Sequence, residues 1–146
     1  MIKVLFLCHG NICRSPMAEF VMRDMVRRAG LSDRIEVSSA AVSREEIGND
    51  IYPGARRKLT EMGVPFSPRV ARQVTKRDME TYDHVILMDE SNRWYLQRLV
   101  GKAADKAAPL LPDREVADPW YTGDFDATWR DVLEGCTRLL EKLKSE

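Results

Sequence analysis

The sequence predicts an α/β fold, a doubly wound four-stranded parallel sheet flanked by helices on both faces. Short apolar runs alternate along the chain with longer segments of helical periodicity. Such runs are typical of strands buried on both faces, and the alternation indicates strand–helix–strand units that lie parallel in one sheet. In these sheets ligands bind beyond the carboxyl ends of the strands. We therefore expect the functional residues directly after the strands.

The first strand and helix are expected at the amino-terminal end. Residues 2–7 form a short apolar run that ends at a Gly/Asn turn, as a buried strand does. Ser15 and Pro16 then predict the start of a helix, with Ser at the N-cap and Pro at the first helical position. The helix is expected to present an apolar face and to end at Gly30.

The remaining elements follow the same alternation. A second strand is expected over residues 34–40 and a helix over 53–62, which begins at a proline. A third strand over 84–88 precedes a helix over 90–100, and a fourth strand is expected over 107–110. The last helix is predicted by an apolar stripe that comprises Trp129, Val132, Leu133, Cys136, Leu139, Leu140 and Leu143.

Length and composition narrow the class of protein. The chain has 146 residues without repeats or linkers, so we expect residues 1–146 to form a single domain. Lys+Arg and Asp+Glu balance at 23 each, which argues against a nucleic-acid binder. No apolar stretch is long enough for membrane insertion, and the apolar run at residues 1–7 is too short for a signal peptide. The three cysteines are too few for a disulfide framework, so a cytoplasmic location is expected.

The segment 8–15 carries the residue types of a phosphate-binding loop between a strand and a helix. Backbone N–H groups in such a loop can point inward at an anion, and the helix N-terminus adds its positive end. Gly10 and Asn11 tolerate the left-handed conformations that a tight loop needs. Arg14 follows Cys8 by six residues, so a loop curled around one phosphate brings the planar Arg14 guanidinium to its oxygens.

Cys8 is the candidate nucleophile of this loop. A helix N-terminus and a nearby arginine favour the thiolate form of a cysteine. The thiolate would attack phosphorus in line with the leaving group and form a cysteinyl-phosphate that water hydrolyses. Ser15 is positioned in sequence to donate a hydrogen bond to Cys8 when the thiolate leaves. The alternative interpretation of Cys8 is an inert cysteine at the end of a core strand.

The Cys-x5-Arg-Ser loop at residues 8–15 resembles that of the low-molecular-weight protein tyrosine phosphatases. Further matches at 71–73, 88–92 and 118–121 spread the resemblance over nearly the whole chain. The resemblance implies hydrolysis of phosphotyrosine and small aryl phosphates, with Asp118 as general acid. Ile12 is typical of the phosphotyrosine enzymes, whereas the phosphoarginine-directed branch tends to have Thr at this position.

The expected site can be stated residue by residue. The catalytic residues are Cys8, Arg14 and Asp118. The phosphate- and substrate-binding residues are His9, Gly10, Asn11, Ile12, Cys13, Ser15, Glu45, Trp120 and Tyr121. Trp120 and Tyr121 would wall an aromatic substrate and partly desolvate the Asp118 carboxyl group. The resemblance also implies that Asn11 orders the loop and that Cys13 forms a reversible disulfide with Cys8. No metal or other cofactor is implied.

Two positions depart from the family pattern. Glu45, with Glu46 beside it, stands where many relatives have an aromatic residue in the loop after the second strand. An acidic wall there would favour substrates with basic flanking residues. Arg69 stands where relatives often have a histidine that supports the phosphate loop from beneath, so the loop is expected to be held differently.

Other ionisable residues are expected to have structural roles. His9 is expected to shape the loop rim, and His84 to be structural at the start of its strand. Arg72 and Asp89 are expected to tie the scaffold together by charge pairing. Cys136 lies in the apolar stripe of the last helix and is expected in the core.

The alternatives to a phosphatase are an arsenate reductase and a catalytically silent phosphate-binding module. Arsenate reduction passes a disulfide along further cysteines, and residues 76–98 contain none. A silent module would be expected to lose the nucleophile or the acid, and both are present. The expected partner is a phosphotyrosine-containing protein or an aryl phosphate, and the expected state is a monomer or weak dimer.

Overall fold

The computed structural model describes residues 1–146 and contains one parallel sheet of four strands. The strands are β1 (Ile2–Cys8), β2 (Ile35–Ala41), β3 (His84–Leu87) and β4 (Ala108–Pro109), in the order β2-β1-β3-β4. All three strand pairs are parallel. The predicted fold class is therefore confirmed, with β4 shorter than the sequence indicated.

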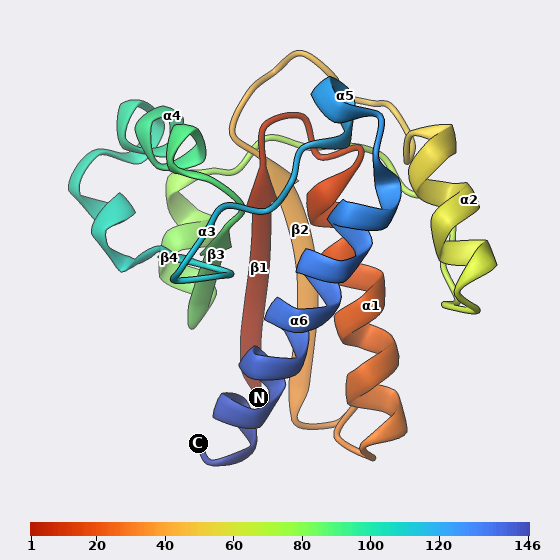
Figure 1. Cartoon of the computed structure of the whole chain (residues 1–146). Coiled ribbons are helices and arrows are strands. Elements are labelled where there is room, and N and C mark those ends of the chain that lie inside the picture. Colours follow the sequence, from red (N-terminus) through yellow and green to blue (C-terminus); the bar gives the residue numbers. More distant parts are fainter.

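The register brings the carboxyl ends of the central strands to one edge. Cys8 at the end of β1 lies opposite Ala41 at the end of β2, and Leu7 lies opposite Leu87 at the end of β3. In Figure 1 the loops that follow these strands gather at the top of the molecule, next to α5. The residues that directly follow each strand therefore meet in one place.

Helices cover both faces of the sheet (Figure 1). The α-helices are α1 (Arg14–Arg28), α2 (Pro53–Glu61), α3 (Lys76–Thr81), α4 (Glu90–Val100), α5 (Pro119–Thr122) and α6 (Phe125–Lys144), and η1 (Gly101–Lys106) is a 3₁₀-helix. Val4 and Phe6 of β1 pack in a core with α1, α2 and α6, whereas Leu5 and Leu7 pack in a second core with α3, α4 and η1. This alternation is the side-chain period of a strand.

The start of α1 differs from the prediction. The helix begins at Arg14 and its N-cap is Cys13, so Ser15 is not the cap and Pro16 is not the first helical residue. The reason is that the Ser15 hydroxyl is occupied by Cys8 and by the side-chain amide of Asn11. The predicted end is confirmed, because α1 stops at Arg28 and Gly30 has a positive φ of 73°.

The stripe of α6 is buried as predicted, with one exception. Leu133 lies at the edge of the stripe and is 38% exposed. Three short helices, α3, η1 and α5, were not predicted, because segments of four to six residues are too short to show helical periodicity. None of the helices has the length and apolar character needed to span a bilayer.

Candidate active site

A cleft of about 440 Å³ opens at the carboxyl ends of the strands. It is lined by Cys8, His9, Gly10, Ile12, Cys13, Arg14, Glu45, Glu46, Asp89, Ser91, Tyr95, Asp118, Trp120 and Tyr121. The structure thus brings together all the predicted site residues except Asn11 and Ser15, which lie beneath the cleft and are fully buried. A larger and more open hollow of about 560 Å³ lies between α1 and β2 and contains no cysteine.

Cys8 is the last residue of β1 and forms the bottom of the cleft. Its side chain is nearly buried, and its Sγ lies 3.0 Å from the Ser15 Oγ. The backbone N–H of Asn11 donates to the same sulfur at 3.3 Å. Because α1 starts six residues later, the sulfur faces hydrogen-bond donors and the positive end of a helix.

Asn11 is the residue on which the loop is built. It is the only non-glycine residue with a positive φ, 59°, and it is fully buried. Its side-chain amide donates to Ser15 Oγ at 2.7 Å and to Ser39 Oγ at 2.9 Å. Because Ser15 Oγ already accepts from Asn11, its hydroxyl hydrogen is free to be donated to Cys8. These bonds hold the left-handed Asn11 backbone, a conformation that Asn adopts more readily than most non-glycine residues.

Two charged residues support Asn11 from outside the loop. Nη2 of Arg69 donates to the Asn11 carbonyl oxygen at 2.7 Å and also to its Oδ1. Ser39, which accepts from Asn11, donates in turn to the buried carboxylate of Glu19 at 2.5 Å, and Arg23 pairs with Glu19 at 2.8 Å. Arg69 thus holds the loop directly at the position where a histidine was expected from the resemblance.

Arg14 is buried beside the phosphate loop and paired with two carboxylates. Its Nη1 lies 2.7 Å from Asp89 and its Nη2 lies 3.2 Å from Asp118. Burial opposes the charge of Arg14, but the neighbouring Cys8, Asp118 and Asp89 raise its pKa above the ordinary value. For Asp89, burial acts to raise the pKa, but hydrogen bonds from Arg14 and Ser91 lower it overall. The guanidinium is therefore charged and fixed in direction.

Asp118 hangs over the cleft from the N-terminus of α5. Its Oδ1 accepts from the Trp120 N–H at 3.0 Å, and its Oδ2 faces Arg14. Pro119 at the first helical position has the fixed φ that suits this short helix. Both oxygens of the carboxyl group are therefore held in place: Oδ1 caps α5, and Oδ2 contacts Arg14 above the phosphate loop.

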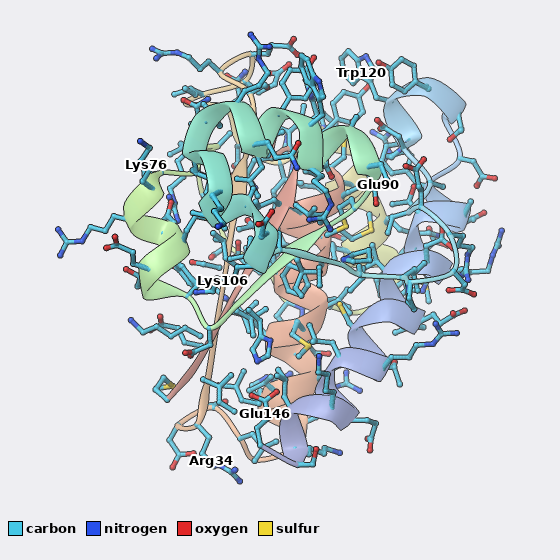
Figure 2. All side chains as sticks on the ribbon, turned by 90° about the vertical axis from the view of Figure 1, so that its left-hand side faces the viewer. Arg34, Lys76, Glu90, Lys106, Trp120 and Glu146 are labelled. Carbon is cyan, nitrogen blue, oxygen red and sulfur yellow. The ribbon has the colours of Figure 1, made fainter.

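The two walls of the cleft differ in character. One carries Trp120 and Tyr121, which are 60% and 85% exposed, and Trp120 packs edge-on against Tyr52 at 5.6 Å between ring centroids. Figure 2 shows Trp120 at one end of the molecule, far from Glu146. The other wall carries Glu45, whose Oε2 lies 2.9 Å from Nε2 of His9.

The three cysteines have different environments. Cys8 and Cys13 are both free thiols that border the cleft. Burial, together with the neighbouring Cys8 and Asp118, raises the pKa of Cys13 to about 12. Cys136 is completely buried in the core, as predicted, and burial raises its pKa.

Arg72, His84 and Asp89, for which structural roles were predicted, each lie within ion-pair distance of a charged side chain. Arg72 pairs with Asp78 at 2.8 Å, and His84 lies 3.0 Å from Glu146, so both are scaffold residues as expected. Asp89 also pairs by charge, but with Arg14, which places it inside the cleft. Its position two residues after the end of β3 could have predicted this place in the cleft, because ligands bind beyond the carboxyl ends of the strands.

Other functional residues escaped the sequence analysis. Tyr95 of α4 lines the cleft and packs edge-on against His9 at 5.1 Å. Ser39 and Glu19 complete the support of Asn11 from β2 and α1. Nothing in their local sequence distinguishes them from core residues, because the contacts are made across elements far apart in the chain.

A cysteine at the bottom of an anion-binding loop, with a buried arginine and an overhanging carboxyl group, defines a cysteine-dependent phosphatase site. The comparisons agree with this class. The family model described as low molecular weight phosphotyrosine protein phosphatase matches residues 3–146. The chain therefore belongs to the low molecular weight phosphotyrosine protein phosphatase family.

Relatives match over the whole length. The chain is 37% identical to the low molecular weight protein-tyrosine-phosphatase YfkJ of Bacillus subtilis, a match that covers 100% of this chain and 98% of that protein. It is 39% identical to the human low molecular weight phosphotyrosine protein phosphatase, which covers 96% of this chain and 94% of the human protein. The crystal structure of YfkJ superposes with a TM-score of 0.93 and covers 99% of this chain and 96% of that chain.

Proposed function

We propose that residues 1–146 act as one phosphatase domain that hydrolyses phosphotyrosine in proteins, and small aryl phosphates, through a cysteinyl-phosphate on Cys8. The single observation that carries this proposal is the set of polar groups around the Cys8 sulfur. Donors from Ser15 and Asn11 converge on it at 3.0 and 3.3 Å, and Arg14 lies buried beside it. A core cysteine without a function needs none of these groups.

In the first step the phosphate dianion of the substrate enters the loop. The Arg14 guanidinium keeps its Nη1 contact with Asp89, and two phosphoryl oxygens replace the Asp118 carboxyl group at its remaining N–H groups. The Cys8 thiolate attacks phosphorus, the S–P bond forms and the P–O bond to the phenol breaks. Asp118, which is released from Arg14 and protonated in the substrate complex, donates its proton to the departing phenolate oxygen.

In the second step water hydrolyses the cysteinyl-phosphate. Asp118, now a carboxylate, removes a proton from the attacking water, the new P–O bond forms and the S–P bond breaks. The Ser15 hydroxyl donates a hydrogen bond to the leaving Cys8 thiolate. Inorganic phosphate leaves the loop and the starting arrangement returns.

The walls support an aromatic substrate. Trp120 and Tyr121 stand exposed beside Asp118 and provide apolar surface on which a phenol ring packs, while the bottom of the cleft is polar. Because these rings offer a packing surface to a phenol ring, which a serine side chain lacks, phosphotyrosine is expected to be hydrolysed faster than phosphoserine.

The test is turnover of para-nitrophenyl phosphate by the native chain, by Cys8→Ser and by Cys136→Ser. Native protein is expected to release para-nitrophenol and phosphate in equal amounts. Cys8→Ser is expected to lose activity below detection, because an unactivated hydroxyl is a poor nucleophile. Cys136→Ser controls for cysteine loss elsewhere and is expected to keep kcat, although it is less stable because a hydroxyl replaces a buried thiol.

Phosphate binding without turnover by the native chain would overturn the proposal and leave a silent phosphate-binding module. Arsenate-dependent consumption of thiols in place of phosphatase activity would identify a reductase. Equal rates on matched phosphotyrosine and phosphoserine peptides would remove the assignment of substrate class.

A further inference from the structure

The cleft holds an unusual balance of charge for a site that receives a dianion. Four carboxylates line it, Glu45, Glu46, Asp89 and Asp118, against the single guanidinium of Arg14. A phosphate that enters this cleft is attracted by a positively charged side chain only at the bottom, where Arg14 lies. Like charges close to a binding path lower the affinity for an anion unless a cation accompanies it.

The inner and outer carboxylates differ in their partners. Asp89 and Asp118 are paired with Arg14, which compensates their charge. The outer pair, Glu45 and Glu46, has no lysine or arginine within ion-pair distance. Glu45 contacts only the His9 ring, and Glu46 accepts a hydrogen bond from the Asn49 side chain at 2.6 Å.

The position of both glutamates is fixed relative to the phosphate loop. The Glu46 side chain packs against Gly10, where a β-carbon would lie 3.1 Å from the Glu46 Cγ. Glu45 is anchored through His9, whose ring in turn packs edge-on against Tyr95 at 5.1 Å. The Glu45 side chain is 69% exposed, so its carboxylate is open to a substrate that lies across the mouth.

We propose that Glu45 and Glu46 are specificity-determining residues that select phosphotyrosine peptides with lysine or arginine beside the phosphotyrosine. This inference rests on the proposed phosphatase function and names the substrate class of that site. The cation of the peptide takes the place of His9 as the partner of Glu45, and a second cation pairs with Glu46. Neither glutamate touches the reacting atoms, so the selection acts mainly through KM.

The size of the effect follows from the exposure of the pairs. A partly exposed ion pair changes an equilibrium about two- to fivefold, and a like-charge contact changes it similarly in the opposite sense. A peptide with two basic flanking residues is therefore expected to exceed its acidic counterpart by about tenfold in kcat/KM. Salt screens such pairs, so the ratio is expected to shrink as ionic strength rises.

The experiment uses three phosphotyrosine peptides of equal length, with two Lys, two Gln or two Glu beside the phosphotyrosine. The enzymes are the native chain, the double variant Glu45→Gln/Glu46→Gln and the charge reversal Glu45→Lys. Glu80→Gln is the matched control, because Glu80 is exposed on α3 and does not line the cleft. Para-nitrophenyl phosphate, which has no flanking residues, reports the basic reaction in every enzyme.

The native chain and Glu80→Gln are expected to prefer the Lys peptide over the Gln peptide and the Gln peptide over the Glu peptide. For the double variant, the kcat/KM values of the three peptides are expected to agree within about twofold. Glu45→Lys is expected to favour the Glu peptide. Equal native rates on the three peptides, or a preference that survives in the double variant, would overturn the inference while para-nitrophenyl phosphate turnover upholds the phosphatase function. Absence of turnover on every substrate would overturn both.

Discussion

The two sides of the phosphate loop are built in opposite ways. Beneath it lies a floor of buried and half-buried polar side chains that are joined to one another by hydrogen bonds. The floor comprises Asn11, Ser15, Glu19, Ser39 and Arg69. Above it lies a rim of aromatic and acidic side chains with few partners, which are exposed except for the half-buried Glu46. The rim comprises Glu45, Glu46, Trp120 and Tyr121.

This difference separates two tasks. A buried, fully bonded network is rigid, and rigidity preorganises donors for the transition state. Exposed side chains contribute binding energy that can change between substrates without disturbing the chemistry below. We therefore expect changes in the floor to appear in kcat, and changes in the rim to appear in KM.

Asp118 lies on the rim side of the loop but acts on the leaving group. Its substitution should therefore lower kcat, and this is the largest effect that we expect. Asp118→Asn keeps the helix cap and removes the proton. We expect kcat for phenyl phosphate to fall by about 10²–10⁴, and the loss to be smaller for para-nitrophenyl phosphate, whose leaving group needs less protonation. Steady-state kinetics with both substrates measures this, and an equal loss on the two would contradict the general-acid role.

Arg69 tests the floor. Arg69→Met removes the donor to the Asn11 carbonyl and its Oδ1, and a lost hydrogen bond to a charged group amounts to about 1.5–3 kcal/mol. We expect kcat to fall about tenfold at nearly unchanged KM if roughly half of that energy orders the loop in the transition state. Arg69→Lys should recover part of the loss. A change in thermal stability alone, with native kcat, would show that Arg69 supports the fold and not the reaction.

Trp120 tests the rim. Trp120→Ala removes an aromatic surface that is 60% exposed and packs against Tyr52. We expect KM for aryl phosphates to rise about threefold to tenfold, in keeping with the loss of roughly 1 kcal/mol of aromatic contact, with kcat within about twofold. A fall in kcat with unchanged KM would contradict the assignment of substrate binding to the rim.

Cys13 should show the smallest effect on turnover and sharpens the distinction between the two cysteines of the loop. Its pKa of about 12 lies above the ordinary 9.0, so Cys13 is a protonated thiol at neutral pH and becomes reactive only in strong base. We expect iodoacetate at neutral pH to label Cys8 alone and Cys13→Ser to keep kcat within about threefold. Peptide mapping of the labelled protein provides the measurement, and equal labelling of both residues would contradict this environment.

The sequence predicted the parts of the site that are local in the chain. The loop from Cys8 to Ser15 follows a strand and precedes a helix, so its residue types and spacing carry the chemistry by themselves. Asp118 was assigned through the resemblance and lies over the loop, 3.2 Å from Arg14. The main strands and helices, in their order along the chain, followed from periodicity, whereas three short helices were missed and boundaries such as the start of α1 were wrong.

The floor could not be predicted, because its members come from separate elements. Glu19 on α1 and Ser39 on β2 meet only because α1 packs against β2 in the folded chain. Arg69 was noted as a departure, but its contact with Asn11 depends on the path of the loop after α2. Long-range polar contacts leave no local period in the sequence, whereas buried strands and amphipathic helices do.

The central claim is that the phosphoryl group passes through the Cys8 sulfur. The most direct test is to mix Asp118→Asn with a good aryl phosphate, quench within one turnover and map the phosphorylated residue by mass spectrometry. The account predicts one phosphoryl group on Cys8, formed together with an equal burst of released phenol and absent in a Cys8→Ser background. A phosphoryl group on another residue, such as His9, or product formation without any phosphorylated protein would contradict it.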